Sequence, residues 1–134
     1  MILVDTSVWI DHLHRSDPVL VGLLDGSSVL HHPMVLGELA LGGLRNRAEL
    51  VGSLAGLPSA ERATHAEVMH LIESRQLYGD GLSLVGAYLL ASVLLTEGAL
   101  LWTRDKKLQA AARQLGIEFS PVVPTETSEA PVTP

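Results

Sequence analysis

The chain has 134 residues, a formal net charge of −6, 47% hydrophobic residues and no cysteine. This length fits one domain with a sizeable core, and the apolar content is too high for a disordered chain. The lack of cysteine excludes a disulfide scaffold, a zinc–thiolate site and a cysteine nucleophile. The net acidity argues against binding nucleic acid by bulk charge alone, but a local basic patch or a bound metal could reverse the local sign.

No segment of the sequence is typical of a membrane protein. The longest apolar stretch, residues 82–95, is interrupted by polar residues and glycine and is too short to span a bilayer. The N-terminus reaches Asp5 after four residues, without a basic start or a cleavage site. We therefore expect no membrane contact and a cytoplasmic protein.

The first half of the chain alternates short apolar runs with helical patterns. Residues 2–4 predict a buried parallel strand that ends at Asp5, and Thr6 and Ser7 look like N-caps of the next helix. A proline at the first helical position predicts a second helix over residues 17–24. The further elements expected in this half are a strand at 29–32 and helices at 33–41, 46–55 and 60–77.

The second half contains the most apolar helix. Residues 83–96 predict a helix that is apolar on all sides and therefore central. It is followed by an expected strand at 99–103, a helix from Asp105 to Gly116 and a weak strand at 117–119. The pattern predicts one domain over residues 1–120 and a proline-rich, disordered tail over residues 121–134.

The alternation of short apolar strands with helices predicts an α/β fold, specifically a three-layer α/β/α sandwich with a central, mainly parallel sheet. Ligands of such sheets bind beyond the carboxyl ends of the strands. Asp5 follows the first strand and Asp105 follows the strand at 99–103. We therefore expect both carboxylates at the same edge of the sheet.

Three acids could share a site, although each has a simpler interpretation. Asp5 and Asp105 could merely cap helices. Glu38 could lie on a solvated helix edge, but its helical neighbours are mostly apolar, and a carboxylate on such a face needs a partner. Together the three acids suggest a site for Mg²⁺ or Mn²⁺, which prefer oxygen ligands. No histidine pair has the spacing of a zinc-protease motif.

Four motifs in order resemble the PIN-domain nucleases, particularly VapC-type toxins of toxin–antitoxin systems. They are the opening Asp5-Thr6-Ser7-Val8-Trp9-Ile10-Asp11, the helical Glu38, the block at 81–92 and the block at 101–108. Each motif alone is weak, but their order and spacing make a specific signal. The resemblance covers about residues 1–120.

The resemblance implies a small α/β/α domain that cleaves RNA with Mg²⁺ or Mn²⁺. Its catalytic and metal-binding acids correspond to Asp5, Glu38 and Asp105, and its supporting hydroxyl groups to Thr6, Ser7 and Thr103. The resemblance also implies a homodimer and a VapB-type antitoxin that neutralises the enzyme.

One position departs from the family pattern. Gly86 stands where relatives usually carry an acid, in Val85-Gly86-Ala87. The loss of this carboxylate predicts weaker metal binding and weakened or absent activity. The glycine is either a substitution introduced into an otherwise intact toxin, the mark of a natural degenerate homologue, or a change that the remaining acids tolerate. The intact motifs elsewhere favour the first explanation.

Basic residues near the expected site are few. Arg104, Lys106 and Lys107 flank Asp105 and could contact RNA phosphates, in tRNA, rRNA or mRNA. Two alternatives remain beside the ribonuclease. A non-catalytic PIN-fold dimer could bind RNA or an antitoxin. A haloacid-dehalogenase-type phosphatase also uses an aspartate after its first strand, but it needs a second acid where this chain has Ser7.

Overall fold

The structure, a computed structural model, describes residues 1–121, so the predicted tail lies outside the described residues apart from Pro121. Three parallel strands form the sheet in the order β2-β1-β3, with β1 at Ile2–Val4, β2 at Val29–Leu30 and β3 at Leu100–Trp102. The helices are α1 Thr6–His14, α2 Pro18–Asp25, α3 Pro33–Leu41, α4 Arg47–Ala55, α5 His65–Ser74, α6 Leu84–Leu95 and α7 Lys106–Gln114.

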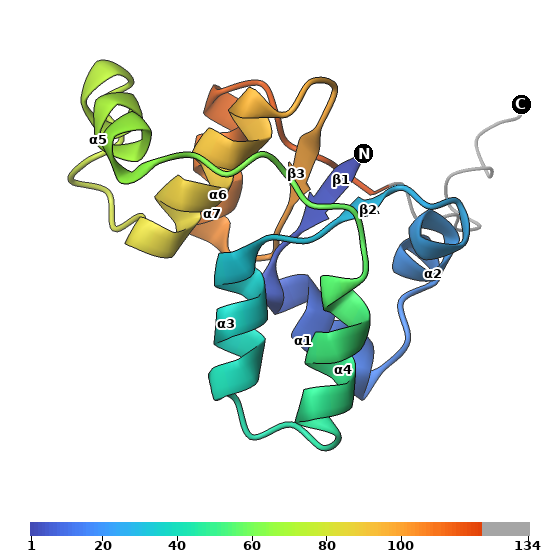
Figure 1. The fold of residues 1–134 in the computed structure, drawn as a ribbon. Coiled ribbons are helices and arrows are strands. Elements are labelled where there is room, and N and C mark those ends of the chain that lie inside the picture. The colour runs from blue at the N-terminus through green and yellow to red at the C-terminus, as the bar shows by residue number, and fades with distance from the viewer. Residues whose placement is uncertain (122–134) are drawn as a thin grey trace, which may run out of the picture.

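Helices flank the small sheet on both sides, and the predicted α/β/α class is confirmed (Figure 1). The strands are buried on both faces, which explains why their sequences are continuous apolar runs rather than alternating ones. Helix α6 is buried along most of its length and packs against β3, α3, α5 and α7. This position requires the all-round apolar sequence that predicted a central helix. No helix within residues 1–121 is long and apolar enough to cross a membrane.

The predicted helix over 60–77 is shorter than expected. Helix α5 begins only after Thr64, whose side chain and that of Glu67 form a reciprocal capping box. The residues before it are not helical. Around Ser59 they form a parallel bridge, in which His31 donates its N–H to Pro58 and accepts the N–H of Ala60. The backbone N–H of Ala60 is thus bonded to His31, just beyond β2, and does not take part in a longer helix.

Two predicted strands are also shorter than expected. The strand at 117–119 is reduced to a single parallel bridge between Leu101 and Glu118. Two backbone hydrogen bonds of 2.8 Å make this bridge, from Leu101 to Ile117 and from Phe119 to Leu101. The strand at 29–32 ends at Leu30, because His32 leaves the sheet to cap α3.

His32 is a buried histidine that links α3 to α6. Its Nδ1 accepts the backbone N–H of Met34, and its Nε2 lies 2.9 Å from the Ser92 hydroxyl oxygen. The ring is 3% exposed, and this burial, followed by the nearby charges of Arg62 and His31, lowers its pKa to about 4. The protein therefore holds His32 in its neutral form at neutral pH.

We expect this histidine to make the fold sensitive to acid. Because the pKa is lower in the folded than in the unfolded chain, its stabilising contribution is complete above about pH 6.5 and is lost as the pH falls toward 4. The expected loss in unfolding free energy is roughly 3 kcal/mol. Urea unfolding at several pH values measures it. His32→Asn should flatten this part of the profile, whereas His14→Gln, at an exposed site, should not. Equal profiles for His32→Asn and the parent would contradict the assignment.

Candidate active site at the carboxyl edge of the sheet

Asp5 is a buried carboxylate directly after β1. It occupies the N-cap position of α1, yet its side chain makes no capping hydrogen bond. Instead its Oδ2 accepts hydrogen bonds of 2.8 Å from the hydroxyl groups of both Ser7 and Thr103. No donor in the described part of the chain reaches Oδ1, although the residue is only 7% exposed. The simpler interpretation of Asp5 as a helix cap is therefore wrong, and a buried charge with one unpartnered oxygen needs another explanation.

Ser7 and Thr103 join the ends of the two neighbouring strands. The Ser7 hydroxyl donates to Asp5 and accepts the backbone N–H of Arg104 at 3.0 Å. The Thr103 hydroxyl donates to Asp5 and accepts the backbone N–H of Asp105 at 3.0 Å. Each hydroxyl thus acts as donor and acceptor and fixes the Asp5 carboxylate against the loop after β3. The local pattern suggested Ser7 as a helix cap, but its hydroxyl contacts the Asp5 carboxylate, as the family resemblance implies for a supporting hydroxyl group.

Glu38 is tied to the same edge from α3. The Thr6 hydroxyl donates to its Oε1 at 2.6 Å, so the residue next to Asp5 in sequence holds the second acid. Glu38 has the partner that its apolar neighbours predicted. Its side chain is nevertheless exposed, as in the simpler interpretation of a solvated helix edge. An exposed carboxylate at this edge remains free to bind a ligand from solution.

Asp105 takes the role of a helix cap. Its Oδ1 accepts the backbone N–H groups of Lys107 at 2.9 Å and Leu108 at 3.0 Å, in the first turn of α7. Asp105 itself is exposed. The simpler interpretation of this acid thus describes its present contacts, while its second oxygen accepts no hydrogen bond from the described residues.

The three acids lie on one connected network but do not form a compact cluster. Hydrogen bonds and chain neighbours link Glu38 through Thr6 to Asp5, and Asp5 through Thr103 to Asp105. Within residues 1–121, no three acidic or histidine side chains lie close enough together to hold a metal ion. The donor set nevertheless fits a hard divalent ion, because Mg²⁺ typically uses one or two carboxylates with water and phosphate. The unpartnered oxygen of the buried Asp5 fits one such ligand.

Gly86 lies in the first turn of α6, facing α7. Its N–H donates to the Ser83 hydroxyl, which caps the helix at 3.0 Å. A Cβ at this position would meet the Cδ1 of Leu82 at 3.1 Å, the Cδ1 of Leu108 at 3.3 Å and the Ser83 hydroxyl oxygen at 3.3 Å. Leu108 belongs to the first turn of α7, which Asp105 caps, so Gly86 packs against that turn. Methyl groups of Leu82 and Leu108 are the carbon atoms nearest to the position of such a Cβ.

Arg104 directly precedes Asp105 in the chain, but its guanidinium binds two carboxylates outside the network of Asp5, Glu38 and Asp105. Its guanidinium binds Asp11 at 2.7 Å and Asp17 at 2.6 Å, and it lies over the Trp102 ring at 5.6 Å. Burial raises the pKa of Asp17, but hydrogen bonds from Leu20, Arg104 and Val19 outweigh it and hold the pKa below its usual value. The sequence singled out Arg104 as a phosphate contact, yet in this structure two carboxylates already neutralise it.

We expect Arg104→Ala to destabilise the fold by about 1 kcal/mol, because partly exposed ion pairs each contribute little. The variant loses both links, to α1 through Asp11 and to the N-cap of α2 through Asp17. Thermal unfolding measures the loss, and 1 M NaCl should reduce the difference from the parent by screening. Arg104→Lys should recover only part, since one ammonium lacks the two-pronged geometry. An unchanged melting temperature together with weaker RNA binding would instead support a phosphate contact.

The sequence does not predict the partners of Arg104. Asp11 stands in the opening motif without an assigned role, and Asp17 is predicted only as the start of a helix. Asp17 does cap α2, through hydrogen bonds from Val19 and Leu20. The sequence feature that could have predicted these ion pairs is charge, because Asp11 and Asp17 are carboxylates with which an arginine can pair. Lys106 and Lys107 are exposed and form no ion pair with a described residue, so they remain candidate phosphate contacts.

The parallel sheet carries carboxylates and hydroxyl groups at its carboxyl edge. These features define the class of the protein as a small α/β domain with an acidic site at that edge. The model of the PIN domain family matches residues 2–114. The chain belongs to the PIN-domain family.

Known relatives agree with this assignment. Over 120 residues the chain is 48% identical to Ribonuclease VapC32 in two strains of Mycobacterium tuberculosis, CDC 1551 / Oshkosh and ATCC 25618 / H37Rv, with 90% of this chain and 97% of each relative covered. The resemblance to VapC-type PIN proteins is thus confirmed. The structure of FitAcB from Neisseria gonorrhoeae has the same fold, with a TM-score of 0.56, 21% identity, and coverage of 84% of this chain and 94% of that one.

Proposed function

We propose that the chain is the toxin of a type II toxin–antitoxin pair and cleaves RNA phosphodiesters as a metal-dependent endoribonuclease. The observation that carries the proposal is the buried Asp5 carboxylate, oriented by Ser7 and Thr103 and left with one unpartnered oxygen. The similarity to Ribonuclease VapC32 supports the substrate class. We assign the activity to residues 1–120, which include the family match over 2–114. We also propose a cytoplasmic location, where such RNA substrates are found.

The proposed cofactor is Mg²⁺ or Mn²⁺, held by Asp5 and Glu38 with a contribution from Asp105. When bound, such an ion lowers the pKa of water and offsets charge on the phosphate. The residues of the chain supply the frame: Ser7 and Thr103 fix one oxygen of Asp5 and leave the other without a hydrogen-bond donor from the described residues. Thr6 holds one oxygen of Glu38 in the same way.

Gly86 gives a specific reason to keep a second candidate function. Leu82 and Leu108 lie close to the position that a Cβ of residue 86 would take, and Asp105 is engaged as a helix cap. A PIN-fold protein that binds RNA or an antitoxin without cleavage would tolerate both features. We therefore propose that Gly86 weakens or abolishes the activity of this chain. Membership in the PIN family leaves the phosphatase alternative without support.

The decisive experiment measures cleavage of a total RNA pool by the purified chain and by Gly86→Asp, each with Mn²⁺ and with excess EDTA. Metal-dependent fragments from either protein would support the endoribonuclease. Binding of RNA without cleavage by both proteins would favour the non-catalytic candidate. Turnover of a generic phosphomonoester, with RNA left intact, would overturn both.

The proposed partners are a VapB-type antitoxin and a second copy of the chain. An apolar groove of about 380 Å³ between α5 and α6 supports the second, since Leu94 and Leu95 border it and Met69 is also exposed on α5. Sedimentation equilibrium at micromolar concentration tests the dimer. A monomer at all concentrations would contradict this proposal and leave the proposed activity standing.

A further inference from the structure

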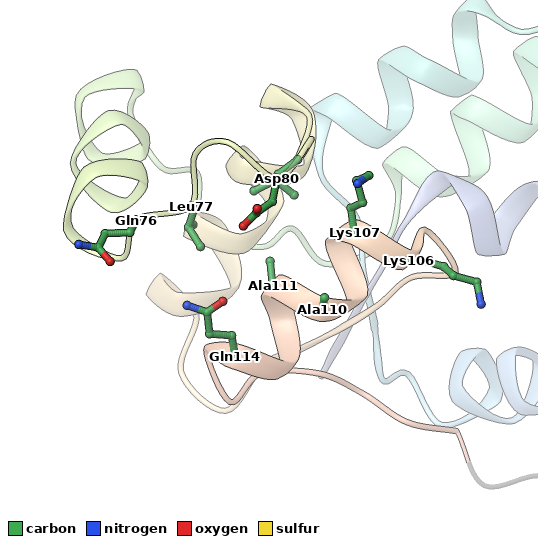
Figure 2. A pocket seen from close by; sticks show the side chains of 9 residues that line it. Gln76, Leu77, Asp80, Lys106, Lys107, Ala110, Ala111 and Gln114 are labelled. Atoms are coloured by element: carbon green, nitrogen blue, oxygen red, sulfur yellow. The ribbon is translucent and has the colours of Figure 1, made fainter.

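A cavity of about 290 Å³ lies between α7 and the loop that joins α5 to α6 (Figure 2). Leu77, Leu82 and Ala111 give it apolar walls, and Asp80 and Gln114 give it polar groups. In Figure 2 the Asp80 carboxylate points toward the space between Leu77 and Ala111, and the Gln114 amide lies beside the same space. Apolar walls with a few polar groups are typical of sites that bind a flat organic molecule.

The cavity adjoins the acidic site through the first turn of α7. Lys106 and Lys107 line it and directly follow Asp105 in the chain. Ala111, on the same cavity wall, lies roughly 9 Å from Asp105 along the axis of α7 by helix rise. The Lys107 stem lies across Gly81, where a Cβ would be 2.9 Å from its Cδ and Cε. The loop and the helix thus contact each other at Gly81 and Lys107.

Resting on the proposed ribonuclease function, we propose that this cavity binds a guanine base of the RNA next to the cleaved phosphodiester. The apolar walls suit the faces of a base that has left its stack. The Asp80 carboxylate accepts two parallel hydrogen bonds, and among the four RNA bases only guanine offers two adjacent N–H donors on its pairing edge. The Gln114 amide can donate to a base oxygen, and Lys106 and Lys107 attract the flanking phosphates.

In this proposal the carboxylate and the two lysines of the cavity contact different parts of the RNA. Asp80 alone would repel RNA, but the two lysines on the neighbouring turn offset its charge. The carboxylate therefore selects the base, while the ammonium groups hold the backbone. Asp80 lies outside the hydrogen-bond network of Asp5, Glu38 and Asp105, so its substitution leaves that network intact.

The test is titration of the full chain, without added metal, with GMP, AMP, CMP and UMP, followed by amide chemical shifts. We expect GMP to bind about tenfold more tightly than the other nucleotides, with shifts at Leu77, Asp80 and Ala111. Asp80→Asn should lower GMP affinity about tenfold, to the level of AMP. The matched control is Asp25→Asn, an exposed acid at the end of α2, which should keep the preference.

Equal affinity for the four nucleotides, no binding of any of them, or shifts confined to other surfaces would overturn the guanine site. So would a preference for GMP that survives Asp80→Asn. Because this readout needs neither metal nor cleavage, its result is independent of the RNA assay. A guanine preference in a chain that cleaves no RNA would uphold the cavity and reject the proposed activity, and cleavage without the preference would do the reverse.

Discussion

Asp5→Asn is expected to lower RNA cleavage by at least about 100-fold, because it removes the charge that holds the proposed metal. The fold should survive, since the asparagine oxygen can still accept from Ser7 and Thr103. Without metal, the unfolding free energy should stay the same or rise by about 1 kcal/mol, because a buried charge with an unpartnered oxygen is removed. Single-turnover cleavage in the more active of the parent and Gly86→Asp backgrounds, with urea unfolding, measures both effects.

Asp25→Asn is the matched control for this variant, because it makes the same chemical change at an exposed position on α2. It should alter neither cleavage nor metal binding. Full cleavage by Asp5→Asn in a folded protein would remove Asp5 from the site. A large loss of stability in the same variant would show instead that the Asp5 charge serves the packing of the sheet edge.

Gly86→Asp is expected to tighten Mn²⁺ binding by about tenfold and to raise cleavage in parallel. The new carboxylate would start in the first turn of α6 and enter the region beside the turn of α7 that Asp105 caps. Its Cβ lies 3.1 Å from a methyl group of Leu82 and 3.3 Å from one of Leu108, so both side chains must move by a few tenths of an ångström. These are the ends of flexible side chains, and the change is therefore tolerable. Isothermal calorimetry measures the affinity without reference to activity.

Gly86→Asn distinguishes the effect of a negative charge at position 86 from the effect of side-chain size. Asparagine meets the same leucines with nearly the same shape, but it carries no charge. It should bind Mn²⁺ no more tightly than the parent does. Equal affinities of the Asp and Asn variants would exclude position 86 from the metal site. Gly86→Ala adds a third comparison, because it replaces a helical glycine, which costs about 0.5–1 kcal/mol relative to alanine, without adding a ligand.

Much of the fold followed from local patterns, and the exceptions have a common cause. The apolar runs of β1 and β3 and the uniformly apolar α6 predicted buried elements, and the structure places them at the centre. The errors lie where a segment pairs with a distant one. Residues 60–63 are not helical, and Ala60 bonds to His31 instead. Residues 117–119 make a single bridge, to Leu101. Periodicity within a segment carries no information on such partners.

For the site, the sequence by itself determined which chemical groups are available. It supplied Asp5 at the end of a strand, two hydroxyl residues after it, an acid on the third helix and a glycine where the resemblance implies an acid. These residues sufficed to predict the PIN family, because their types and order are properties of the chain alone. The absence of cysteine already restricted a metal site to oxygen and nitrogen ligands.

Only the tertiary structure decided what each of these groups contacts. Asp5 and Asp105 both look like helix caps in sequence, yet Asp105 caps α7 whereas Asp5 accepts from Thr103, 98 positions away. Arg104, which looked free to bind phosphate, is held by Asp11 and Asp17. The physical reason is that a hydrogen bond or ion pair depends on separation in space at the scale of 3 Å, which the packing of α1, α2 and the strands sets.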